Sequence, residues 1–146
     1  MRLLGYIAGL AVIVGGIQLG GLLVHFLDLP AAFLVFAGAI VFAVSAHGAQ
    51  FWRALQAGFL STPIAPHEVE PLARVLQSLR VILHGMGIAT TLTGWINMLV
   101  QASEITLVTF GPAAAVSLLA LLYGVIAAEL IVAPARHRLL NRAPTP

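Results

Sequence analysis

Apolar and polar positions alternate along this chain in long blocks. Four apolar stretches, joined by short polar segments, run roughly over residues 3–27, 30–46, 81–100 and 106–132. A helix needs about 20 apolar residues to cross the roughly 30 Å of hydrocarbon in a bilayer. Three of the four stretches reach that length alone. The pattern predicts an all-α membrane protein with four transmembrane helices, organised as a single membrane domain over residues 1–146.

The positive charges follow the same blocks. The chain has no lysine, and all of its arginines lie outside the apolar stretches. Arg2 precedes the first stretch, whereas the links around Asp28 and Glu104 carry no arginine. The other arginines lie between the second and third stretches or after the fourth: Arg53, Arg74, Arg80, Arg136, Arg138 and Arg142. Cytoplasmic segments carry the excess of arginine, so both termini are predicted in the cytoplasm, with a cytoplasmic connection over 47–80 and a cytoplasmic tail over 133–146.

Composition narrows the function classes. Hydrophobic residues make up 60% and charged residues 8% of the chain, with a mean hydropathy of +1.03, whereas a soluble domain has about 25% charged residues. The pI near 9.9 comes from arginines expected beside anionic lipid, and it gives no evidence for nucleic acid binding. The absence of cysteine excludes disulfides, thiol catalysis and cysteine metal sites.

The 47–80 connection is expected to extend two of the spans. Residues 48–60 could continue the second span as a helix that leaves the membrane. Pro63 and Pro66 must end that helix because two prolines deny it backbone donors. After Pro71, an amphipathic stripe at i, i+3, i+4 and i+7 predicts a helix that runs unbroken into the third span. The stripe consists of Leu72, Val75, Leu76 and Leu79.

The first two spans are expected to form a hairpin. Residues 27–30 read as a tight turn, with Pro30 opening the second helix. The first span contains glycines four residues apart, at Gly5/Gly9 and Gly16/Gly20. This spacing lets helix backbones approach closely in lipid, most simply through ordinary packing within one subunit.

One face of the third span is polar. Thr90, Thr93, Asn97 and Gln101 fall at i, i+3, i+7 and i+11, which places them on one side of a helix. In hydrocarbon such a face turns to water or to a partner helix. The simpler interpretation is that these hydroxyl and amide groups form hydrogen bonds between packed helices. Both interpretations stay open.

Motifs in the third and fourth spans resemble the last two spans of the MotA branch of the MotA/TolQ/ExbB proton-channel family. The third span carries a Gly-x-x-x-Thr-x-x-Gly row, and the fourth opens with Gly-Pro, continues with small residues and reaches Leu-Tyr-Gly. The matching residues are Gly87, Thr91, Gly94, Gly111, Pro112, Tyr123 and Gly124. The hairpin of the first two spans is also similar, and the resemblance covers about two-thirds of the chain.

The resemblance implies an ion channel-forming subunit in a bacterial inner membrane. Family members form a pentamer around two copies of a MotB/TolR/ExbD-like single-span partner, whose aspartate carries the ion, in most cases a proton. Thr91 would line the ion path, with Thr90 and Ser117 beside it. The chain supplies no ion-carrying carboxylate of its own near the middle of the membrane, which fits a subunit that depends on its partner's aspartate. Asp28 and Glu104 are expected at one membrane surface, and Glu129 near the headgroups of the other.

Two differences from the MotA family pattern leave an alternative function open. Relatives usually have a second pore threonine where this chain has Leu121, although Ser117 lies on the same helix face as Gly124. The 47–80 connection is also much shorter than the large cytoplasmic domain with which MotA proteins grip a rotor. A non-conducting four-helix membrane scaffold is therefore the alternative function.

An enzyme is not expected. The five histidines include no i, i+3 or i+4 pair, and no carboxylate cluster accompanies them, so neither a metal site nor a cofactor is predicted. The P-loop, Rossmann and nucleophile-elbow patterns are also missing from the sequence.

Overall fold

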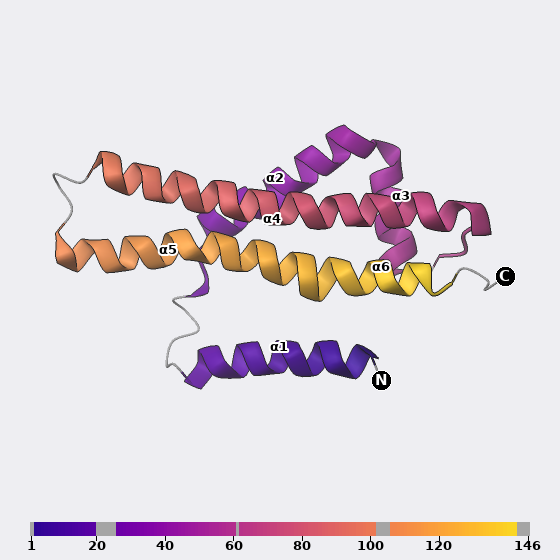
Figure 1. Ribbon diagram of the computed structural model, residues 1–146, viewed down its shortest axis with the longest axis horizontal. Helices are drawn as coiled ribbons and strands as arrows, with labels where there is room; N and C mark the ends of the chain where they lie inside the picture. Colours follow the sequence, from indigo (N-terminus) through magenta and orange to yellow (C-terminus); the bar gives the residue numbers. More distant parts are fainter. Residues whose placement is uncertain (1, 20–25, 61, 102–105, 143–146) are drawn as a thin grey trace.

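The computed structural model describes residues 2–19, 26–60, 62–101 and 106–142, and these residues are helical apart from short connections (Figure 1). In chain order the elements are α1 (Arg2–Leu19), α2 (Leu29–His47), α3 (Ala49–Phe59), the 3₁₀ turn η2 (Pro66–Glu68), α4 (Val69–Val100), α5 (Leu107–Ile126), the π-helical segment η3 (Ala127–Val132) and α6 (Ala133–Leu140). The all-α prediction is confirmed for these residues.

Among the described residues, three helical segments are long and apolar enough to cross a membrane: Leu29–His47, Pro66–Val100 and Phe110–Leu140. They correspond to the second, third and fourth predicted spans. The first predicted span is represented by α1, which is not among the three, and residues 20–25 lie outside the described ranges. A helical membrane protein is therefore established, while the count of four spans stays a prediction.

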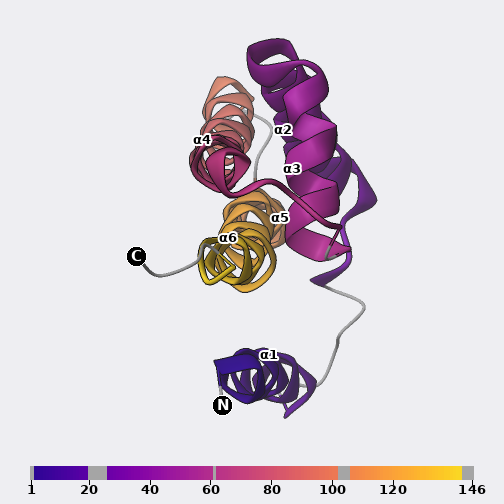
Figure 2. The same ribbon diagram turned by 90° about the vertical axis from the view of Figure 1, so that its right-hand side faces the viewer.

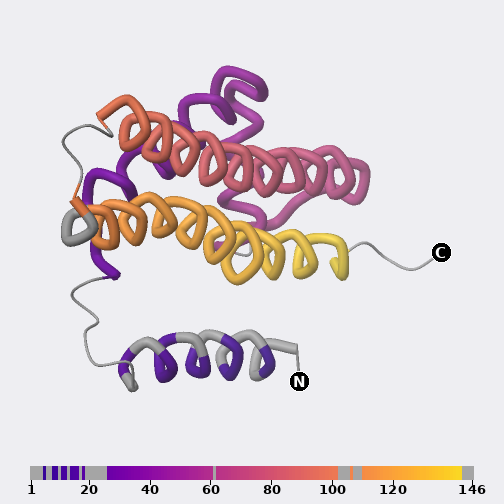
Figure 3. Tube along the Cα trace, turned by 60° about the vertical axis from the view of Figure 1, so that its left-hand side comes forward, coloured from indigo at the N-terminus to yellow at the C-terminus, as the bar shows by residue number. Residues whose placement is uncertain are grey.

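The centre of the molecule is an antiparallel pair, α4 and α5, which lie side by side in all views (Figure 3). Helix α4 has 32 residues and is about 48 Å long at 1.5 Å per residue, so it extends well beyond a hydrocarbon core. The predicted unbroken helix from the cytoplasmic connection into the third span is confirmed. Its first turns bury the predicted stripe of Leu72, Val75, Leu76 and Leu79.

The second span does not extend as predicted. Helix α2 ends at His47, and Gly48 adopts φ 54° and ψ −131° before α3 begins at Ala49. A positive φ suits glycine because it lacks a Cβ. The chain therefore turns at Gly48, and α3 folds back to pack Phe51, Ala54 and Ala57 against α4 and α6. Trp52 and Arg53 are left on the exposed face.

The fourth span continues beyond its predicted end as one rod of α5, η3 and α6. Pro134 lies in the first turn of α6, where it has no N–H to donate and its ring would clash with the carbonyl four residues earlier. The wider π turn of η3 directly precedes it, which relieves that clash. Residues 133–140, predicted as part of a tail, are thus helical.

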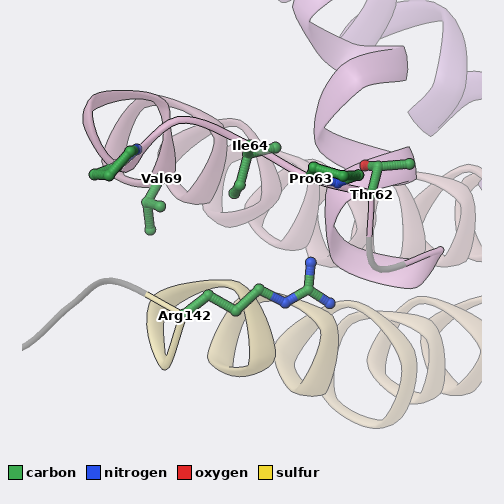
Figure 4. Close-up of a pocket in the computed structure, with 6 residues that line it drawn as sticks. Thr62, Pro63, Ile64, Val69 and Arg142 are labelled. Carbon is green, nitrogen blue, oxygen red and sulfur yellow. The ribbon is translucent and has the colours of Figure 1, made fainter.

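The end of this rod is joined to the α3–η2 connection. Arg142 donates a hydrogen bond to the Ala57 carbonyl oxygen at 3.0 Å. Figure 4 shows its side chain reaching toward Thr62 and Pro63, beside a cavity of about 370 Å³. These contacts hold α6 against the segment that precedes α4.

The arginines from Arg53 onward belong to α3, to the first part of α4, or to α6 and the residues just after it. These elements gather at one end of the α4–α5 pair (Figure 1). The positive-inside interpretation requires this arrangement, although the orientation in a membrane stays a prediction.

Helix α1 lies to one side of the other helices (Figures 1 and 2). A Cβ added at Gly5, Gly9, Gly15 or Gly16 would meet no atom within 4 Å. The close packing predicted for Gly5 within one subunit is therefore not present among the described residues. Gly20, the partner of Gly16 in the predicted spacing, lies outside them.

Candidate functional site: a polar groove between α2, α4 and α5

Glycines bring α4 and α5 into backbone contact. A Cβ added at Gly124 would lie 2.6 Å from the Leu83 carbonyl oxygen, and one added at Gly87 would lie 3.0 Å from the Ala120 carbonyl oxygen. A larger residue at Gly124 must push the helices apart, whereas at Gly87 the neighbouring backbone must give by a few tenths of an ångström. Two of the motif glycines are thus explained by close approach of one helix to the other.

Thr91 and Ser117 lie in the same seam. The Thr91 side chain is buried, and its hydroxyl donates to the Ser117 carbonyl oxygen at 2.9 Å. The Ser117 hydroxyl donates to Ala113 one turn earlier at 3.0 Å, and Gly94 provides the space for it on α4. Thr91 therefore joins α4 to α5 within one subunit, and its role in an ion path stays a prediction.

The remaining motif positions are more exposed. Gly111 and Pro112 lie on the exposed surface near the start of α5, and Gly111 has open space around it. Helix α5 begins before them, at Leu107, so Pro112 lies inside the helix. Tyr123 is half-buried and stacks on Phe36 of α2 at 6.4 Å between ring centroids.

A groove of about 410 Å³ opens where α2 meets the α4–α5 pair. Its polar lining consists of Asp28, Thr90, Thr93, Asn97 and Ser117. The predicted polar face of the third span is thus turned toward a cavity over three of its four positions. Gln101 is not among the lining residues, and its side-chain amide donates to the Asn97 carbonyl oxygen at 3.3 Å.

Asp28 enters this groove as the N-cap of α2. One of its carboxylate oxygens, Oδ1, accepts a hydrogen bond from the Ala31 N–H at 2.9 Å. Its own N–H donates to the Tyr123 hydroxyl at 2.8 Å, and that hydroxyl donates to the Phe26 carbonyl oxygen at 2.5 Å. Tyr123 thereby fixes the start of α2 to α5.

These contacts set the depth of Asp28 along the α4–α5 pair. Tyr123 lies 16 residues beyond Leu107, about 24 Å at 1.5 Å per residue. Thr90, on the facing helix, lies 10 residues before Val100, about 15 Å from that end. Asp28 therefore lies beside Tyr123 of α5 and beside the turns of α4 that carry Thr90, at the start of a helix that is itself long enough to cross a membrane. The prediction that Asp28 lies at a membrane surface stays a prediction, and Glu104, its expected neighbour there, falls outside the described residues.

A charged cluster lies at the other end of the contact between α4 and α5. Arg80 of α4 donates to both carboxylate oxygens of Glu129 in η3, at 2.7 to 2.9 Å. The His84 Nε2 atom lies 3.3 Å from Glu129 Oε1, and its Nδ1 lies 2.8 Å from the Arg80 carbonyl oxygen. Glu129, expected to reach lipid headgroups, is instead paired inside the subunit. The 49 residues between the two charges hid this pair from sequence patterns.

No group of three or more histidine, aspartate and glutamate side chains in the described part of the chain is placed to hold a metal ion. No protein-family model matches the chain, and a search of curated proteins finds no relative. The fold and the groove define a helical membrane protein with polar side chains gathered between three apolar helices.

Proposed function

We propose that this chain is an ion channel-forming subunit of a MotA/TolQ/ExbB-type motor or energy-transducing complex in a bacterial inner membrane. Five copies surround a MotB/TolR/ExbD-like single-span partner, whose aspartate carries a proton. The observation that carries the proposal is the polar groove beside the α4–α5 seam, where three apolar helices bring polar side chains together.

The physical support is the cost of polar groups in hydrocarbon. Intramembrane polar side chains face a water-filled cavity, a protein interior or one another. Thr90 and Thr93 both line such a cavity, although the Thr93 hydroxyl also donates to the Ala89 carbonyl oxygen of its own helix. The motif positions Gly87, Thr91 and Gly94 lie beside it on the same helix.

The composition of the complex tests this proposal. The chain, tagged and extracted gently from its native membrane, is expected to purify as five copies with two copies of a single-span protein that bears a membrane aspartate. Native mass spectrometry gives both numbers directly. A monomer, or an assembly without such a protein, contradicts the proposal.

Replacing Thr91 by valine tests the ion path. Valine matches the shape of threonine but loses the hydroxyl, so folding is expected to change by only about 1 kcal/mol. Ion uptake into vesicles that contain the whole complex is expected to fall about tenfold or more, because the hydroxyl proposed to line the ion path is lost. The matched control is Ser45→Ala, which removes an exposed hydroxyl on α2. Equal uptake by the Thr91→Val variant and the wild type would disprove the role of Thr91.

A non-conducting scaffold is the second candidate. The Thr91 hydroxyl already has an acceptor inside its own subunit, and Leu121 stands where members of the MotA/TolQ/ExbB family usually have a second pore threonine. Both features suit a helix pair built only to pack. The complex reconstituted with its partner separates the two functions, since a scaffold gives no ion flux above that of empty vesicles.

A further inference from the structure

In the described part of the chain, the carboxylate of Asp28 is the one acidic group lining the groove between α2, α4 and α5. The proposed channel function uses a carboxylate supplied by a partner and assigns no role to this one. We propose that Asp28, with the hydroxyl and amide groups around it, forms a binding site for a proton or a monovalent metal cation within this chain. Binding at this site requires neither a pentamer nor a partner, whereas the uptake measurement below rests on the proposed function.

The first argument is the oxygen chemistry of the groove. Asp28 Oδ1 accepts one hydrogen bond from Ala31, and no partner for Oδ2 occurs among the described residues. The Thr93 hydroxyl donates its hydrogen to the Ala89 carbonyl oxygen at 2.9 Å, so its lone pairs remain available. Thr90 and Asn97 contribute a second hydroxyl and an amide oxygen to the same lining.

The second argument is charge balance. Among the described residues, the groove lining contains Asp28 but no arginine and no histidine. An ionised carboxylate in a groove between apolar, membrane-length helices needs compensation, because its transfer from water is costly. The N-terminus of α2 offers only the partial positive charge of a helix dipole. A bound proton or metal cation would supply the remaining charge.

A role as helix cap alone is the competing explanation, and substitution can separate the two. Asparagine and serine cap helices about as well as aspartate, but neither can ionise. Asp28→Asn and Asp28→Ser therefore keep the cap and remove the charge. Asp28→Glu keeps the charge on a longer side chain.

The first experiment uses native membranes that contain the full chain. A hydrophobic carbodiimide reacts with protonated carboxyl groups in apolar surroundings, and mass spectrometry locates the adduct. Labelling of Asp28 is expected, while Glu70, exposed and paired with Arg74, serves as an internal control that stays unlabelled. Protection by sodium chloride would identify a metal cation, and labelling insensitive to sodium would identify a proton.

The second experiment measures ion uptake by the variants in the same membranes. Asp28→Asn and Asp28→Ser are expected to reduce uptake about tenfold or more with an unchanged thermal unfolding midpoint, and Asp28→Glu to retain part of it. An unlabelled Asp28, or an Asp28→Asn variant that transports like the wild type, overturns the proposal. Labelling in a complex without a single-span partner would keep this site and reject the proposed channel. A complex of five copies of this chain with two copies of the single-span partner, in which Asp28 stays unlabelled, would support the proposed channel and reject this site.

Discussion

Replacement of Arg80 by leucine is expected to destabilise the folded chain by about 2 kcal/mol, between the cost of breaking an exposed ion pair and that of breaking a buried one. The substitution leaves Glu129 with a carboxylate that has lost three hydrogen bonds. Both side chains are about one-third exposed, at 34% and 36%, so the pair is partly buried. The thermal unfolding midpoint in a mild detergent, followed by size-exclusion chromatography, measures the loss.

Two controls define this result. Arg74 pairs with Glu70 on the same helix, but these side chains are 74% and 76% exposed, so Arg74→Leu is expected to change stability by less than about 1 kcal/mol. The double variant Arg80→Leu with Glu129→Leu removes both charges and is expected to recover most of the lost stability. If the single variant Arg80→Leu were no less stable than Arg74→Leu, the pair would not be holding η3 to α4.

Substitution of Gly124 by alanine is the second large effect. The new Cβ would lie 2.6 Å from the Leu83 carbonyl oxygen, and a backbone atom cannot move aside as a flexible side chain can. Overpacking of this kind costs about 1–3 kcal/mol, and here it must also separate α4 from α5. We expect a lower unfolding midpoint together with reduced recovery of the assembled complex from membranes.

Other glycines of the chain provide a graded control series. Gly85 lies on α4 close to Gly87 but has open space around it, so Gly85→Ala is expected to be neutral or stabilising by up to about 1 kcal/mol. Gly38 faces the flexible end of Met86, which can move, so Gly38→Ala should fall between these two. Equal stabilities for Gly124→Ala and Gly85→Ala would mean that the two helix backbones are not in contact.

Sequence periodicity located the helices well because their causes are local. Long apolar runs must become helices in a membrane, since only internal hydrogen bonds satisfy the backbone there. The start of α2 follows from an aspartate cap with a proline in the first turn. The long α4 follows from an apolar stripe at helical spacing that meets the third span without a breaker. Gly48 was missed as a turn, because a single glycine inside a helical pattern is usually tolerated.

The candidate site also has features that the sequence predicted and features that it did not. The polar row of Thr90, Thr93 and Asn97 was predictable from its spacing on one helix. The same holds for the close approach at Gly87 and Gly124, because small residues in a membrane helix mark a packed face.

The partners of those residues, and the depth at which they meet, were decided only by the tertiary structure. Arg80 meets Glu129 across 49 residues, and the contact of Asp28 with Tyr123 spans 95 residues. Both contacts depend on how far one helix is shifted along its neighbour, and no local pattern encodes that shift. For this reason the sequence alone determined the helices and their polar faces, whereas packing determined which charges are paired and that Asp28 lies within the groove.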